Sequence, residues 1–352
     1  MRHSQYERKV LLIERINRAN APFYVQFELT EKCNNKCYFC YNPLGHVTGN
    51  ELTTNQVKNI LEQLREMNVF RINFNGGEPL TRKDIKEIIK YAYDLGFELH
   101  MNTNSTLVTD DIAEFISHYM KSVCTSILHS NEVEHDRMTG RVGAYQDVIR
   151  GIKTWRRHGV NVEVNVCTSA ENYSDIYNIG KLCAELDCYA LCSTRYILND
   201  SKNKNMLLDS KMTMELIDTL TKVKVDFPSI SDVSLPGPVP YCEVDKAYYE
   251  KLRILNIPCQ YGYGLARISP VGKVTPCTIS DDVIGDLNDI SFKEIWKAEG
   301  WAKYEHLCHI PKGCQECSEI KRCKGGCVVY DESIIACGEE VCTKKWGYAD
   351  GK

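Results

Sequence analysis

Short apolar runs typical of buried strands recur between residues 23 and 197, at 23–29, 69–75, 98–103, 122–128, 160–166 and 189–197. Between them, apolar residues recur with the period of a helix, at 53–68, 82–95, 110–119, 144–158 and 173–186. Thr53 and Thr81 precede the first two helices as N-caps. Gly96 and Gly159 stand where two helices should end. The pattern predicts alternating strands and helices.

Six strands that alternate with helices predict parallel strands joined by right-handed crossovers, and therefore an α/β fold. Ligand sites of such sheets lie at the C-terminal ends of the strands. A further helix is predicted at 209–227, a proline-rich linker at 228–240 and a helix at 292–304. We expect four parts: a helical segment (1–22), the strand–helix repeats (23–200), a helix with the linker (201–241) and a cysteine-dense region (242–352).

Composition is that of an ordinary globular protein, with 43% apolar and 26% charged residues and a net charge of −4. No basic run and no apolar stretch of membrane length occurs, so we expect neither a nucleic-acid nor a membrane partner. The 18 cysteines fall in tight groups, and the N-terminus has no signal-peptide core. Thiolates on metal in a reducing cytoplasm are favoured over disulfides.

Three cysteines, Cys33, Cys37 and Cys40, follow the first predicted strand in the order C-x3-C-x2-C. Three thiolates on one short loop can bind three corners of a 4Fe–4S cluster and leave one iron open to a small molecule. Zinc is the alternative, with His46 as a fourth ligand.

This loop, with Phe39 before its last cysteine, resembles that of radical S-adenosylmethionine (SAM) enzymes. A Gly-Gly-Glu-Pro segment after the second strand strengthens the resemblance. It implies a partial (β/α)6 barrel, in which SAM chelates the open iron and the Gly-Gly-Glu-Pro segment binds its amino group. Carried over by position, the SAM-binding residues are Phe39, Gly76, Gly77, Glu78, Pro79, Asn104 and Ser126.

Two features depart from the family pattern near the fourth strand. Leu128-His129 replaces the usual Asp-Gly after Ser126, and Thr139 stands where the family has an arginine after its His-Asp pair. Arg137 or Arg141 could take over that arginine's contact with SAM, or could form surface ion pairs. Arg195, on the last predicted strand, points either into the site or into solvent.

The C-terminal cysteines resemble the SPASM extension of the same family. Cys259 is followed by Gly272-x4-Cys277 and then by C-x2-C-x5-C-x3-C from Cys314 to Cys327. The resemblance implies two auxiliary 4Fe–4S clusters, one on Cys259, Cys277 and Cys327 and one on Cys314, Cys317, Cys323 and Cys342. Cys337 is the alternative to Cys342. A pair of zinc sites is the alternative to both clusters.

The first auxiliary set lacks one cysteine that fully ligated members carry; Tyr261 and Tyr263 occupy that gap. Cys242 or Cys308 could complete the set. The remaining cysteines in apolar segments are expected to pack as small hydrophobes: Cys124, Cys167, Cys183, Cys188 and Cys192. Thr278 replaces the aspartate base of sulfatase-maturing relatives, which disfavours formylglycine formation.

The resemblance implies an enzyme with three 4Fe–4S clusters and SAM that makes a 5′-deoxyadenosyl radical. We expect it to cross-link, epimerise or oxidise a ribosomally made peptide; a small-molecule or cofactor precursor is the alternative substrate. A non-catalytic electron carrier is the alternative from another class, but it needs no open iron. Expected partners are the peptide and an electron donor such as ferredoxin or flavodoxin. About 22 residues precede the first strand, so any leader-binding protein is expected to be separate.

Overall fold

The computed structural model describes residues 18–41, 50–197, 201–257, 259–305, 314 and 317–327. All six expected strands are present and each pairs in parallel with the next. Their bounds are β1 (Tyr24–Thr30), β2 (Arg71–Gly76), β3 (Glu98–Thr103), β4 (Ser122–Ser126), β5 (Val162–Thr168) and β6 (Ala190–Arg195).

The sheet extends past the expected strands at both edges. On one side β7 (Asp232–Pro236) pairs with β6, and β8 (Asn256–Ile257) pairs with β7. On the other side β9 (Leu265–Ile268) pairs in parallel with β1, and β10 (Lys273–Thr275) and β11 (Gly285–Asp286) follow in antiparallel order. The proline-rich stretch at 228–240 therefore contains strand β7. The strand tolerates Pro236 because this proline is its last residue, where no ladder hydrogen bond is lost.

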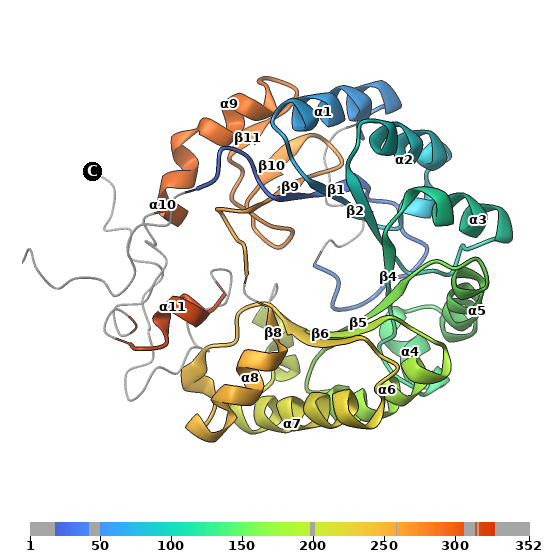
Figure 1. Cartoon of the computed structure of the whole chain (residues 1–352), viewed down its shortest axis with the longest axis vertical. Coiled ribbons are helices and arrows are strands. Elements are labelled where there is room, and N and C mark those ends of the chain that lie inside the picture. Colours follow the sequence, from blue (N-terminus) through green and yellow to red (C-terminus); the bar gives the residue numbers. More distant parts are fainter. Residues whose placement is uncertain are drawn as a thin grey trace, which may run out of the picture.

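Helices cover the outside of the curved sheet, and the strands form its inner ring (Figure 1). The described helices are α1 (Thr54–Glu66), α2 (Ile85–Asp94), α3 (Asp110–Tyr119), α4 (Glu132–Thr139), α5 (Ala144–Arg157), α6 (Ile176–Glu185), α7 (Ser210–Asp226), α8 (Tyr249–Leu255), α9 (Phe292–Lys297), α10 (Ala302–Glu305) and α11 (Ile320–Cys323). This is an α/β partial barrel with a C-terminal extension of its sheet. No described helix has both the length and the apolar character that crossing a membrane requires.

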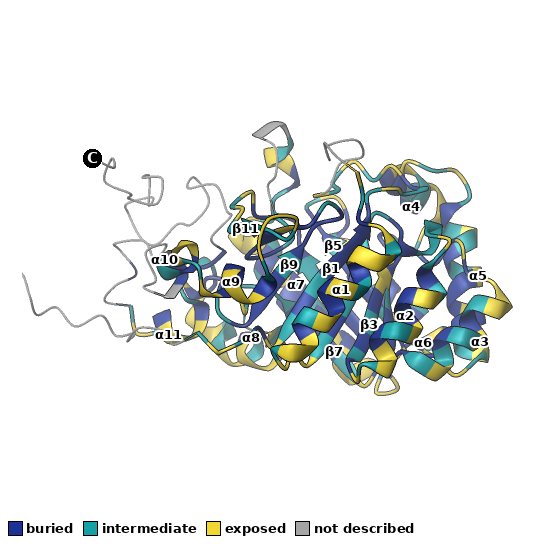
Figure 2. Cartoon of the chain, turned by 90° about the horizontal axis from the view of Figure 1, so that it is seen from above, coloured by how far each residue is buried: buried dark blue, intermediate teal, exposed yellow. Residues whose placement is uncertain are grey.

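The core lies between the strands and the helices. In β1, Val25, Phe27 and Leu29 are buried in this core, so the alternating residues Gln26 and Glu28 face the inside of the barrel. Figure 2 shows buried strands and helices whose exposed faces point outward. Polar side chains therefore line the concave face of the sheet.

Helix starts follow local chemistry. Thr53 caps α1 as expected, with Gln56 completing a capping box. The expectation that Thr81 caps the next helix is wrong, because α2 starts after Asp84. Thr81 instead donates to the carbonyl of Glu78 at 2.7 Å. The helix expected at 292–304 is broken at Ala298, which has an extended backbone between α9 and the next turn.

Candidate functional site

The loop with Cys33, Cys37 and Cys40 follows the C-terminal end of β1 and lies inside the ring of strands (Figure 1). The end of this loop is anchored on β1, because Tyr41 donates a hydrogen bond to the buried carboxylate of Glu28 at 3.4 Å. Arg267 of β9 forms an ion pair with the same carboxylate. Burial raises the pKa of Glu28, and the arginine opposes that shift. This anchor joins the loop to β9, a strand of the C-terminal region.

Gly76 and Gly77 let a second loop, at the end of β2, pack directly on the backbone that leads into the cysteine loop. A Cβ on Gly77 would lie 2.4 Å from the carbonyl oxygen of Lys32, and one on Gly76 would lie 2.3 Å from that of Thr30. The amide of Gly77 donates to Thr30 and that of Glu78 to Lys32, both at 2.7 Å. The glycines therefore fix the two loops against each other.

Glu78 is completely buried, and its carboxylate is hydrogen-bonded to other residues of the protein. Its carboxylate accepts hydrogen bonds from the amide of Asn104 at 2.6 Å, the hydroxyl of Thr103 at 2.8 Å and the amide of Leu80 at 3.0 Å. Burial raises its pKa to about 7, while these donors oppose the rise. Glu78 ties the end of β3 to the turn that begins at Pro79.

Asn104 continues this connection to the cysteine loop. Its side-chain amide donates to Asn34 at 2.8 Å and approaches the sulfur of Cys33 at 3.8 Å. Its carbonyl oxygen accepts from Thr106. The side chain is thus held by neighbours on both sides, so it positions the loop in addition to any contact with a ligand.

The three loop thiols are half-buried and interact electrostatically with one another. Burial, with a smaller effect of Cys40, Cys33 and Cys167, raises the pKa of Cys37 to about 12. Among the described residues, no three His, Cys, Asp or Glu side chains converge as ligands of a single metal ion. The sulfur donor set itself suits an iron–sulfur cluster, which takes thiolates on separate irons.

Phe39 and Ser126 differ in burial: Phe39 is half-buried, whereas Ser126 is exposed. Phe39 packs beside Cys167 against the buried Tyr196 and Met206. Ser126 ends β4 and is exposed on the side of the sheet opposite the core. Both lie at the C-terminal strand ends, where the cysteine loop also lies.

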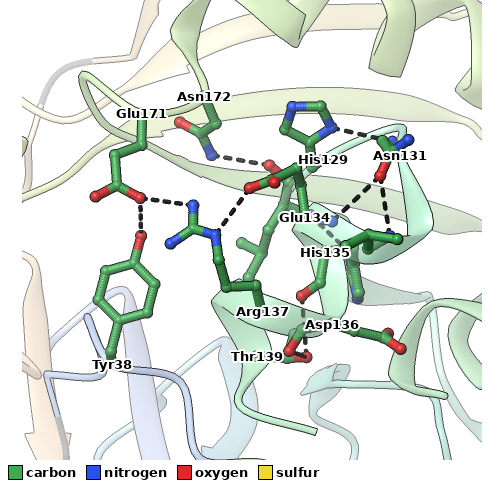
Figure 3. A network of polar contacts seen from close by, with 12 residues as sticks. Tyr38, His129, Asn131, Glu134, His135, Asp136, Arg137, Thr139, Glu171 and Asn172 are labelled. Atoms are coloured by element: carbon green, nitrogen blue, oxygen red, sulfur yellow. Dashed lines mark hydrogen bonds and ion pairs between the residues drawn. The ribbon is translucent and has the colours of Figure 1, made fainter. Parts of the chain in front are cut away.

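Arg137 belongs to a surface network (Figure 3). It is bonded to Glu134 at 2.8 Å and Glu171 at 2.9 Å, and Glu171 also accepts from Tyr38 at 2.6 Å. The neighbouring His135 is buried, which lowers its pKa to about 4, and it accepts from the amide of Leu128. Arg137 therefore anchors the cysteine loop from outside through Tyr38.

Arg141 also contacts the cysteine loop. It donates to the Asn35 side chain at 2.9 Å and pairs with Asp147 at 2.8 Å. Its second terminal nitrogen is buried and has no hydrogen-bond partner among the described residues. A buried, unused guanidinium N–H beside this loop suits an anionic ligand group.

Arg195 points to neither of the places expected for it. It forms a buried ion pair with Glu243 at 2.5 Å and donates to the carbonyl of Pro238 at 3.3 Å. It therefore fixes the chain that follows β7 against the end of β6.

The structure brings Cys259, Cys277 and Cys327 together. The thiols of Cys327 and Cys259 both raise the pKa of Cys277, although burial is the main cause. Tyr261 lies beside Cys277 and Cys327, and Tyr263 donates to the carbonyl of Cys259. The two tyrosines thus occupy the neighbourhood where the sequence lacks a cysteine.

A second group contains Cys314, Cys317 and Cys323. The amide of Cys317 donates to the carbonyl of Cys314 at 3.1 Å, and that of Cys323 donates to Glu319 at 3.1 Å. Four further candidate ligands lie outside the described residues: His46, Cys308, Cys337 and Cys342.

Sequence reasoning missed the Glu28–Arg267 pair, whose members are 239 residues apart, and the bond between Arg141 and Asn35. An acidic residue at an inward position of an apolar strand is the only signal that pointed to Glu28. No local signal paired either residue with its partner.

Comparisons with known proteins agree with this arrangement. Residues 27–183 match the radical SAM superfamily, and residues 259–324 match the iron–sulfur cluster-binding domain called SPASM. The chain is 28% identical to PqqA peptide cyclase of Bradyrhizobium diazoefficiens, over 87% of this chain and 81% of that protein. It is 26% identical to AdoMet-dependent heme synthase of Methanosarcina barkeri, over 87% of this chain and 91% of that protein.

Solved structures share the fold. Streptococcus suis SuiB bound to precursor peptide SuiA matches with a TM-score of 0.73 and 16% identity, over 89% of this chain and 75% of that one. Native anSMEcpe with bound AdoMet matches with a TM-score of 0.68 and 20% identity, over 88% of this chain and 92% of that one. These likenesses establish the barrel and its C-terminal extension.

Proposed function

The chain belongs to the radical SAM superfamily and carries a SPASM domain, and from this premise we propose that it modifies a ribosomally made peptide. The observation that carries the proposal is its likeness to PqqA peptide cyclase over most of both chains. A cluster with SAM, when bound, supplies a 5′-deoxyadenosyl radical that removes hydrogen from an unactivated carbon. The residues described above would hold these groups and orient the substrate.

The cysteine loop would hold the first cluster through Cys33, Cys37 and Cys40. Arg141 would bind the carboxylate of SAM with its unused nitrogen, and the loop from Gly76 to Pro79 would receive its amino group. Two further clusters would lie on the C-terminal cysteine groups. Cys342 is proposed as a ligand of the second on sequence spacing alone.

The concave face of the barrel favours a peptide over a substrate with several carboxylates. Two described arginines on this face, Arg71 and Arg267, are ion-paired with Glu98 and Glu28, and of their buried nitrogens only the Nε of Arg267 is left without a hydrogen-bond partner among the described residues. Buried amide oxygens on the same face lack hydrogen-bond partners within the described chain: those of Gln26, Asn73 and Asn75. Side-chain amides can pair with the N–H and C=O groups of a peptide backbone, and an unpaired buried amide is costly.

We expect Arg141→Ala to weaken SAM binding by about tenfold or more, since a buried charge-assisted hydrogen bond contributes about 1.5–3 kcal/mol. Isothermal titration of the anaerobic, cluster-loaded protein measures the affinity. Arg157→Ala is the matched control, because that arginine is paired with Asp110 at the surface and makes no described contact with the cysteine loop, and its SAM affinity should stay within about twofold. Equal losses in both variants would exclude the contact between Arg141 and SAM.

Glu78→Gln should also weaken SAM binding while the first cluster stays bound. Either orientation of the glutamine amide sets an N–H2 group against the amide of Asn104 or of Leu80, at a cost of about 1–3 kcal/mol. Iron content and visible absorbance measure the cluster, and titration measures SAM. Glu98→Gln, at the opposite end of β3, is the control; loss of the cluster in Glu78→Gln alone would show a purely structural role.

Coexpression with short peptides encoded beside its gene tests the proposed function. We expect one peptide to increase 5′-deoxyadenosine release from the reduced enzyme and to change in mass or gain solvent deuterium; a cross-link removes about 2 Da, the two hydrogens lost. Release that responds only to a carboxylated small molecule would favour a cofactor precursor. No 5′-deoxyadenosine from an enzyme with an intact, reducible first cluster would indicate an electron carrier.

A further inference from the structure

Lys324 lies between the two C-terminal cysteine groups, directly after Cys323 and three residues before Cys327. We infer that its ammonium group raises the reduction potential of the cluster proposed for Cys259, Cys277 and Cys327, because it places a positive charge beside that cluster. The inference rests on the proposed position of this cluster, but it does not depend on the identity of the substrate.

The backbone of Lys324 has a conformation that is unfavourable for a lysine. This residue ends α11 in the left-handed region, at φ 51° and ψ 32°, and its amide donates to the carbonyl of Ile320 at 2.8 Å. The next two residues with positive φ are glycines, Gly325 and Gly326. Of the four described non-glycine residues with positive φ, the other three have short polar side chains: Asn68, Ser105 and Asp187. A long, charged side chain at a strained position points to a use for the side chain itself.

The side chain of Lys324 folds back onto the segment that contains Cys259. Its ammonium nitrogen lies 4.0 Å from the ring centroid of Tyr263 and donates to the phenol oxygen of that residue. The same phenol donates to the backbone carbonyl of Cys259. The ammonium, the phenol and the carbonyl therefore form a continuous chain of contacts that ends at a proposed cluster ligand.

The charge of Lys324 also acts on the sulfur of Cys259. Burial raises the pKa of the Cys259 thiol, and the ammonium opposes that rise because it favours the thiolate. Lys324 is half-buried, so water and salt screen its charge less than that of an exposed lysine. Two other basic residues at this end of α11, Lys321 and Arg322, are exposed, and Arg322 is paired with Glu319 at 2.8 Å. Of these three cations, Lys324 is the one whose described contacts lead to a cysteine group.

A positive charge beside an iron–sulfur cluster favours the reduced form of that cluster. The cluster gains one negative charge when it takes up one electron, and a nearby ammonium attracts the added charge. Lys324 thus makes the cluster of the Cys259 group a better electron acceptor. It does so through its charge, without being a ligand of the iron.

Redox titration of the anaerobic, cluster-loaded protein tests the inference, with low-temperature electron paramagnetic resonance as the readout. The signal that Cys277→Ala removes identifies the cluster of the Cys259 group. Lys324→Gln removes the charge but keeps a long side chain, whereas Lys324→Gly also relieves the strain of the left-handed backbone. In both variants, the ratio of reduced to oxidised cluster at a fixed potential should fall about tenfold, which equals a decrease of about 59 mV for a one-electron couple.

Two controls separate the charge of Lys324 from its place in the fold. Lys324→Arg retains the charge and should keep the ratio within about threefold of the wild-type value. Lys321→Ala removes an exposed cation of α11 and should leave the ratio unchanged. Melting temperatures are measured in parallel, because a purely structural role would change the stability and leave the potential unchanged.

The outcomes distinguish the inference from the proposed cluster position on which it rests. An unchanged potential in a folded Lys324→Gln or Lys324→Gly variant overturns the inference alone; if one of these variants does not fold, the other decides. A wild type without any signal that Cys277→Ala removes would refute the cluster position, and the inference with it.

Discussion

Replacing Cys33, Cys37 and Cys40 together by alanine should abolish 5′-deoxyadenosine release and leave about two thirds of the iron, because one of three clusters loses its ligands. The three thiols lie on one loop and interact electrostatically. The side chains that hydrogen-bond this loop to the rest of the protein are those of Asn34, Asn35 and Tyr38, which the triple variant keeps. The protein should therefore stay folded. Iron analysis and chromatography of the SAM reaction measure the two effects.

Cys167→Ala is the matched control for this triple variant. Its thiol influences Cys37 electrostatically, yet it lies on β5 and outside the loop. It should retain all of the iron and most of the activity. A triple variant that keeps its full iron content would show that the loop does not hold a cluster.

Replacing Cys314 and Cys317 by alanine should abolish the modified product while some 5′-deoxyadenosine release survives. The reason is that SAM cleavage and substrate oxidation would use different metal centres. Cys314 is buried in the C-terminal region, its carbonyl accepts a hydrogen bond from the amide of Cys317, and both lie outside the loop that carries Cys33, Cys37 and Cys40. Iron should fall by about one third.

Mass spectrometry of the substrate and quantification of 5′-deoxyadenosine separate the two outcomes. Lys321→Ala, an exposed position in α11, is the control and should leave both unchanged. Unimpaired product from the double variant would mean that this cysteine group has no part in the reaction. Simultaneous loss of both signals in a folded protein with an intact first cluster would mean that the centres do not act separately.

Local patterns predicted the elements of the barrel well. Apolar runs and helical periodicity located six strands and their helices, because burial on one face leaves a period in the sequence. The boundaries moved where side-chain hydrogen bonds competed with the pattern. Thr81 bonds to Glu78 instead of capping α2, and Asn131 caps α4, a helix that the periodicity did not reveal.

The site was predicted as a set of residues but not as an arrangement. The cysteine spacing and the Gly-Gly-Glu-Pro segment each lie within a few neighbouring positions, so the sequence alone could mark them as candidates. Their roles in packing depended on the fold. Glu78 and both glycines hold one loop against another, and the sequence could not show which backbone they would meet.

By itself, the sequence determined the α/β class, the cysteine groups and the family, because each depends on residue types at short, regular spacing. The tertiary structure alone decided which distant residues meet: Arg267 with Glu28, Arg195 with Glu243, and Arg141 with Asn35. Such pairs depend on strand order and on the turns between strands. Hydrophobic periodicity specifies which face of an element is buried, but it does not specify which other element covers that face.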